Sequence, residues 1–80
     1  MAVLKQRLKE LRISGKLTQK QLAEVLGVKP LAVQRFEYGE RRPGLDTLIK
    51  IADHFGVSID YLVGRTDDPG IKGLKIESEQ

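Results

Sequence analysis

The chain contains no cysteine and no tryptophan, and it has a single histidine, His54. The absence of cysteine excludes disulfides and metal sites built on thiolates. One histidine supplies too few ligands for a zinc site, so neither a metal nor a cofactor is expected. Without these cross-links, a chain of 80 residues must be stabilised by packing of its apolar side chains.

Long hydrophobic runs are also absent, because every uninterrupted apolar stretch is only a few residues long. This pattern excludes a membrane-spanning helix, and the first residues lack the apolar segment of a signal peptide. The sequence therefore predicts a cytoplasmic protein with no membrane partner. Its carboxylates are scattered over polar positions and form no paired titratable groups of the kind an active site needs. We expect neither enzymatic activity nor a small-molecule substrate.

Charge is present in both signs but is unevenly distributed. Residues 1–50 carry eleven Lys or Arg against five Asp or Glu, a charge of +6, whereas residues 51–80 carry three against six, a charge of −3. A basic segment of this kind indicates a polyanionic partner, most naturally nucleic acid. The alternative is a basic helix face that only contacts solvent. Two scattered tyrosines provide little for base stacking, so RNA is a weaker expectation than DNA.

Helix boundaries are marked most clearly between residues 18 and 39. Thr18 and Gln21 have the spacing of a capping box, which begins a helix, and Gly27 follows where that helix needs a residue of positive φ. Pro30 suits the first position of a new helix, which Gly39 ends. Two short helices joined by about three residues that include a glycine are typical of a helix-turn-helix.

The apolar spacing predicts helices on both sides of this motif. Residues 1–12 form one amphipathic helix, which Gly15 ends. Residues 45–55 form another, and Ser58 caps a short final helix. The apolar residues that define these helices and the inner face of the helix that starts at Pro30 are Leu4, Leu8, Leu11, Val33, Phe36, Leu45, Leu48, Ile51, Ala52, Phe55, Ile59, Leu62 and Val63. The prediction is an all-α, compact five-helix domain with a central helix-turn-helix and no strand.

Residues 1–64 are thus predicted to be a helix-turn-helix DNA-binding domain, and residues 65–80 a C-terminal tail. The tail is polar, with a turn at Asp67 to Gly70 and three apolar residues, Ile71, Leu74 and Ile76. Two interpretations stay open: the tail is loosely ordered, or its apolar residues attach to the domain or to a second copy of the chain.

A series of apolar, polar and glycine positions in fixed order extends from Leu4 to about Gly64. Its members are Leu17, Thr18, Gln19, Leu22, Ala23, Leu26, Gly27, Val28, Val33, Phe36, Glu37, Gly39, Pro43, Leu45, Asp46, Thr47, Leu48, Ile51, Ala52, Phe55, Gly56, Val57, Ser58 and Leu62. This series resembles the phage repressor and Cro type of helix-turn-helix regulators, the XRE family. The resemblance implies a lambda-repressor-like fold whose third helix enters the major groove of double-stranded DNA, usually as a homodimer on a two-fold symmetric operator.

Site residues follow from the resemblance position by position. It implies base contacts on the outward face of the third helix, from Lys29, Pro30, Leu31, Gln34 and Arg35. It implies backbone contacts from Thr18, Gln19, Lys29, Arg41 and Arg42. An amide such as Gln34 can pair with adenine, and a guanidinium such as Arg35 with guanine. It also implies an ion pair between Arg12 and Glu37 that orients the third helix.

The sequence departs from the family pattern in four places. Gly15-Lys16 inverts the commoner order, in which glycine comes second, and Gly44 replaces a frequent serine cap; neither change bears on function. The other two do. Lys29 stands where a serine or threonine usually caps the third helix, and its ammonium group cannot accept the free amide hydrogens there. Leu31 is aliphatic where most members are polar, and it has two open interpretations: contact with a thymine methyl group, or packing on a neighbour or partner chain.

The sequence thus favours a DNA-binding transcriptional regulator, most naturally a repressor. The alternative is a protein-binding adaptor or antitoxin-like module of the same fold, with Leu31 and Pro30 at the centre of its interface. Contacts between subunits are expected from the tail and from Ile59, Tyr61, Leu62 and Val63.

Overall fold

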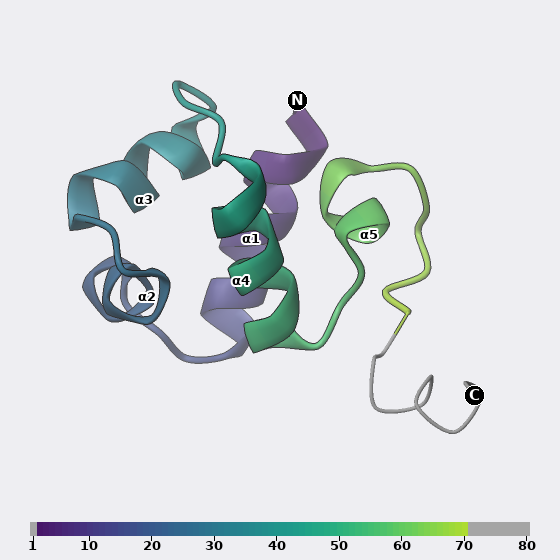
Figure 1. The fold of residues 1–80 in the computed structure, drawn as a ribbon, viewed down its shortest axis with the longest axis horizontal. Helices are drawn as coiled ribbons and strands as arrows, with labels where there is room; N and C mark the ends of the chain where they lie inside the picture. Colours follow the sequence, from purple (N-terminus) through teal and green to yellow (C-terminus); the bar gives the residue numbers. More distant parts are fainter. Residues whose placement is uncertain (1, 71–80) are drawn as a thin grey trace.

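The computed structural model describes residues 2–70 and consists there of helices and turns, without a strand. Five helices follow one another along the chain: α1 (Ala2–Ser14), α2 (Gln19–Leu26), α3 (Pro30–Tyr38), α4 (Leu45–Phe55) and α5 (Ile59–Val63). In Figure 1, α1 and α4 lie at the centre, with α2 and α3 on one side and α5 on the other. The predicted all-α, five-helix architecture is therefore confirmed.

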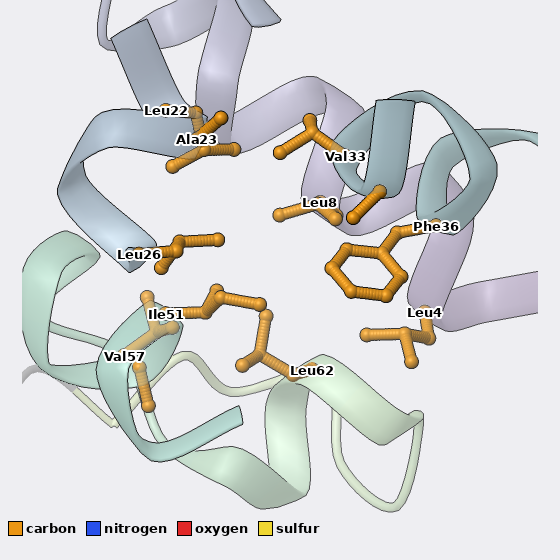
Figure 2. Close-up of a cluster of buried hydrophobic side chains, with 12 residues drawn as sticks. Leu4, Leu8, Leu22, Ala23, Leu26, Val33, Phe36, Ile51, Val57 and Leu62 are labelled. Carbon is orange, nitrogen blue, oxygen red and sulfur yellow. The ribbon is translucent and has the colours of Figure 1, made fainter. Parts of the chain in front are cut away.

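All five helices contribute to one hydrophobic core, which Figure 2 shows at close range. Its largest fully buried side chains are Leu8, Leu22, Leu26, Val33, Ile51 and Leu62. The apolar spacing of the sequence thus identified most of the inner face of α1, α3 and α4, although Leu45 at the start of α4 is 66% exposed. Helices α2 and α3 pack against each other and lie together on one side of α1 and α4 (Figure 1).

The helix-turn-helix forms through the local signals expected of it. The Thr18 hydroxyl accepts a hydrogen bond from the Gln21 amide at 3.0 Å, and the Gln21 side chain accepts one from the Thr18 amide at 2.9 Å. Gly27 ends α2 with a φ of 72°, and its N–H is directed at the carbonyls of Ala23 and Glu24. The chain turns there and enters α3 at Pro30, after Lys29, whose side chain makes no capping hydrogen bond. The loss of the usual cap, expected from the lysine, is confirmed.

The turn between α1 and α2 places a non-glycine residue in the left-handed region. Lys16 has a φ of 59°, whereas the φ of the preceding Gly15 is not positive. Side chains are disfavoured at positive φ because Cβ approaches the backbone, so the inverted order Gly15-Lys16 introduces local strain. The Lys16 amide nevertheless bonds to the Ile13 carbonyl at 2.9 Å, which closes the turn.

Residues 65–70 lie against the domain through Arg7 of α1. The Arg7 guanidinium donates to the Tyr61 carbonyl, to the Thr66 carbonyl at 2.8 Å and to the Asp67 carboxylate at 2.6 Å. The same guanidinium stacks 4.1 Å above the Tyr61 ring. The Ser58 amide also donates to the Pro69 carbonyl at 2.7 Å. The first part of the predicted tail therefore continues the fold, while Ile71, Leu74 and Ile76 lie outside the described residues.

One expected contact between subunits is wrong. Leu62 has no exposed surface and belongs to the core of the monomer, because it points inward from the short helix α5. Ile59 and Tyr61 pack partly against the same core, and Val63 is half-buried. Leu62 is thus unavailable to a second copy.

Replacing Arg7 by alanine is expected to release residues 65–70. Loss of the charged donor leaves the Thr66 carbonyl without its partner, and the Tyr61 carbonyl keeps only the Gly64 amide at 3.2 Å, so the free energy of unfolding should fall by about 1–2 kcal/mol. Hydrogen exchange at the Ser58 amide, measured by NMR, should accelerate together with this loss. Asp67→Asn is the control: the Asp67 side chain is 99% exposed, so its ion pair contributes little. Equal protection of the Ser58 amide in Arg7→Ala and the parent chain would contradict the prediction.

Candidate nucleic-acid interface

Helix α3 has one buried and one exposed face. Val33 and Phe36 are 0% and 3% exposed and attach the helix to the core. On the opposite face Lys29, Leu31 and Arg35 are exposed, as is Pro30 at the start of the helix. Gln34, expected to point outward with Arg35, is half-buried. The exposed face therefore carries two cations, Lys29 and Arg35, and one aliphatic side chain, Leu31.

These side chains border a shallow hollow of about 250 Å³. Its walls come from the turn before α3, from α3 itself and from the loop after it: Val28, Lys29, Leu31, Ala32, Arg35 and Arg41. The Arg41 guanidinium reaches back over α3 to lie 5.8 Å from the Phe36 ring centre. The fold thus brings Arg41 beside Lys29 and Arg35, and it adds Val28 and Ala32, which the sequence had not suggested for this site.

Arg42 lies apart from this group although it follows Arg41 directly. It lines a second hollow of about 230 Å³ together with Leu4, Pro43, Leu48 and Val63. These residues come from α1, the α3–α4 loop, α4 and α5. The side chains of Arg41 and Arg42 therefore line different hollows. A phosphate contact by Arg42 stays a prediction.

Arg12 and Glu37 form an ion pair between α1 and α3. Arg12 Nε lies 2.6 Å from Glu37 Oε2, and Nη2 lies 3.1 Å from Oε1. Arg12 Nη1 also donates to the Leu17 carbonyl at 2.9 Å. The two side chains are 13% and 2% exposed. The pair therefore connects α1, the turn before α2 and the last turn of α3. That it orients α3 stays a prediction.

Gln19 is the third member of this arrangement. Its side-chain amide donates to Glu37 Oε1 at 3.1 Å, which links the start of α2 to α3. The sequence had suggested a phosphate contact for Gln19 but gave no sign of this bond, because the two residues are 18 positions apart. The Gln21 amide donates to the Thr18 hydroxyl, whereas the earlier amide hydrogens of the first turn of α2 have no partner within the helix. The backbone beside Gln19 can therefore offer donors to an anion. Thr18 is exposed, and its hydroxyl hydrogen stays available because the oxygen acts as the cap acceptor.

Other kinds of site are not found in the part of the chain that the structure describes. Residues 2–70 contain no group of three or more His, Cys, Asp or Glu able to hold a metal ion. Over the same range, every helix is too short and too polar to cross a lipid bilayer.

Comparisons with known proteins agree with this geometry. A helix-turn-helix family model matches residues 8–62. The HTH-type transcriptional regulator YobD of Bacillus subtilis is 43% identical over 84% of this chain and 60% of its own length. The cryptic phage CTXphi transcriptional repressor RstR of Vibrio cholerae is 39% identical over 78% of this chain and 55% of its own length. The chain thus spans three fifths or less of these two relatives.

Two solved structures give the same result for the fold. The P22 c2 repressor protein in complex with a synthetic operator superimposes with a TM-score of 0.72 and 27% identity, covering 75% of this chain and 91% of that chain. A transcriptional regulator from Listeria innocua superimposes with a TM-score of 0.75 and 31% identity, over 92% of this chain and 73% of that chain. The arrangement of all five helices is therefore shared with regulators of transcription.

Proposed function

Because this chain belongs to the XRE-type helix-turn-helix family, we propose that it binds a specific double-stranded DNA operator and represses transcription. The observation that carries the proposal is the group of three cations, Lys29, Arg35 and Arg41, around the exposed face of α3. A helix with a basic exposed face and a buried apolar face can enter the major groove while it stays attached to its domain. The repressors among the similar proteins, RstR and the P22 c2 repressor protein, support repression as the outcome.

The side chains take separate roles in this proposal. Arg35 contacts the O6 and N7 atoms of a guanine, since it is exposed at the middle of α3. Gln34 contacts an adenine with its side-chain amide, although it is half-buried and therefore extends less far from the helix than Arg35. Phosphates are bound by Lys29, Arg41 and Arg42, and by Thr18 with the first amide hydrogens of α2. The Arg12–Glu37 pair positions α3 without touching DNA.

The operator is proposed to be two-fold symmetric and bound by a homodimer. Helix α3 has nine residues and spans only a few base pairs, so one copy specifies too short a site. Two copies place their α3 helices about 34 Å apart, one turn of DNA.

Selection of bound fragments from a random duplex pool tests the proposal and the role of Arg35 together. The parent chain should enrich an inverted repeat that contains guanine in each half-site. Arg35→Ala should still bind, with the guanine preference at one position per half-site reduced by about 1–3 kcal/mol. Arg35→Lys keeps the charge but lacks the planar fork, so it should restore affinity more than specificity.

The matched control is Arg65→Ala. Arg65 is exposed and follows α5, which lies across the domain from α3 (Figure 1). This variant should enrich the same sequence as the parent chain. If the parent enriches no sequence from the pool, the proposed function is wrong.

A further inference from the structure

We infer that Gln19 is a positioning residue, whose side chain acts on DNA binding through Glu37 and not through contact with a phosphate. The inference rests on the proposed function, and it names the bond that holds the phosphate-binding end of α2 against the base-reading helix α3. A polar side chain at the start of a helix that meets DNA would by itself suggest a phosphate contact. The direction of the Gln19 side chain therefore decides its role.

The side chain of Gln19 is directed into the domain. Its Nε2 atom donates to Glu37 Oε1 at 3.1 Å, and the residue is half-buried although it is the first of α2. Glu37 Oε1 also accepts from Arg12 Nη2 at 3.1 Å, while Oε2 accepts from Arg12 Nε at 2.6 Å. Gln19 thus supplies one of three hydrogen bonds to a single carboxylate.

A neutral donor is the kind of group that this position requires. The Glu37 side chain is only 2% exposed, and a buried carboxylate is costly unless it is paired and hydrogen-bonded. Arg12 already balances its negative charge, so a second cation would leave excess positive charge away from water. An amide donates to Oε1 without adding charge. Transfer of the Gln19 amide to a phosphate would take this donor from a buried oxygen, so the bond is expected to persist on DNA.

The bond joins the two ends of the helix-turn-helix that the turn leaves apart. The turn at Gly27 connects the end of α2 to the start of α3, whereas the bond connects the start of α2 to the last turn of α3. The start of α2 is proposed to bind a phosphate, and Arg35 lies two positions before Glu37. Without the bond, the phosphate contact and the base contact are held less exactly relative to each other. A base contact made of two directed hydrogen bonds tolerates such a displacement poorly.

The test compares Gln19→Met with the parent chain on two duplexes, the operator selected from random DNA and an unrelated sequence of the same length, at one salt concentration. Methionine has a side chain of similar length but cannot donate a hydrogen bond. The ratio of the two affinities should fall by at least about fivefold, since one bidentate base contact provides about fivefold to 150-fold discrimination. A lost phosphate contact would instead weaken both duplexes by the same factor, because phosphates carry no sequence information.

A second measurement removes the acceptor instead of the donor. In a chain that carries Arg12→Met and Glu37→Met together, the carboxylate is absent, so adding Gln19→Met should change the ratio by less than about twofold. Gln6→Met is the matched control. Gln6 donates to Glu10 at 3.4 Å on an exposed part of α1, so its replacement should leave the ratio as in the parent chain.

The outcomes separate this inference from the function on which it rests. If an operator is selected but Gln19→Met weakens both duplexes equally, or lowers the ratio by less than about fivefold, the inference is overturned and the proposed function stands. The same holds if Gln19→Met lowers the ratio by more than about twofold in the chain that lacks Glu37. The single variant decides the matter even if the triple variant fails to fold, because it leaves the core and the Thr18–Gln21 capping box intact. If no operator is selected at all, both the function and the inference fail.

Discussion

Replacing Arg12 by methionine is expected to lower the free energy of unfolding by about 3–5 kcal/mol. The cause is the Glu37 carboxylate, which is 2% exposed and loses two of its three hydrogen-bond donors with the guanidinium. A small domain has a total stability of about 5–15 kcal/mol, so this loss is a large share of it. The measurement is urea unfolding at 25 °C followed by circular dichroism.

A second substitution separates two contributions to stability: the cost of leaving the buried Glu37 carboxylate unpaired, and the net stabilisation that the intact ion pair provides. When Glu37→Met is added to Arg12→Met, both charges are gone, and a well-packed apolar pair of similar volume is often neutral or stabilising. Most of the lost stability should therefore return. Lys9→Met, on the exposed face of α1, is the control and should change stability by less than about 0.5 kcal/mol.

The double variant also tests the positioning role of the pair. If the pair orients α3, the double variant should be stable yet bind the selected operator more weakly than the parent chain. Equal affinity of the double variant would restrict the pair to a stabilising role. A loss below about 1 kcal/mol in Arg12→Met would instead show that both groups are hydrated, as in a surface ion pair.

The fold was largely predictable from the sequence because its signals are local. The capping box at Thr18 and the breaks at Gly27 and Gly39 each act within a few residues of the position they mark. The inner faces also followed from spacing, since Val33 and Phe36 lie on the same side of any helix that starts at Pro30. Consistent local signals of this kind are what make a sequence specify one arrangement.

The features that escaped prediction depend on contacts between distant segments. Arg7 bonds to groups 54–60 residues away, so helical spacing showed only a basic residue on a polar face. Gln19 had an expected role outside the protein, and only the closeness of α2 and α3 reveals Glu37 as its partner. Leu62 was misassigned for a related reason, because a helix of five residues is too short for its apolar spacing to define an inner face.

The site itself was predicted as a set of residues but not as a surface. The outward face of α3 followed from the helix period, whereas the place of Arg41 depends on how the α3–α4 loop folds back. Two consecutive arginines with identical chemistry lie on different hollows, and no pattern in the chain distinguishes them. Their separate contributions to DNA binding are therefore a direct test of the structure.

Salt should weaken operator binding steeply. Three cations per copy, Lys29, Arg41 and Arg42, are proposed to neutralise phosphates, which gives six contacts in a dimer. Each contributes a slope of about −0.9 to a plot of log K against log salt concentration, so the expected slope is about −5. Raising salt from about 50 to about 200 mM should then lower the affinity by about 10³-fold. Fluorescence anisotropy with the labelled operator measures this dependence.

Single substitutions assign the slope to particular side chains. Arg41→Ala removes two contacts from the dimer, so the slope should become shallower by about 2. Arg42→Ala should act to the same extent, because its side chain is proposed to turn from the second hollow toward the DNA backbone. An unchanged slope in Arg42→Ala would contradict that assignment. Arg65→Ala, across the domain from α3, should leave the slope as in the parent chain (Figure 1). A parent chain whose affinity does not respond to salt would be incompatible with a basic surface that binds phosphates, because the release of counterions accompanies every such contact.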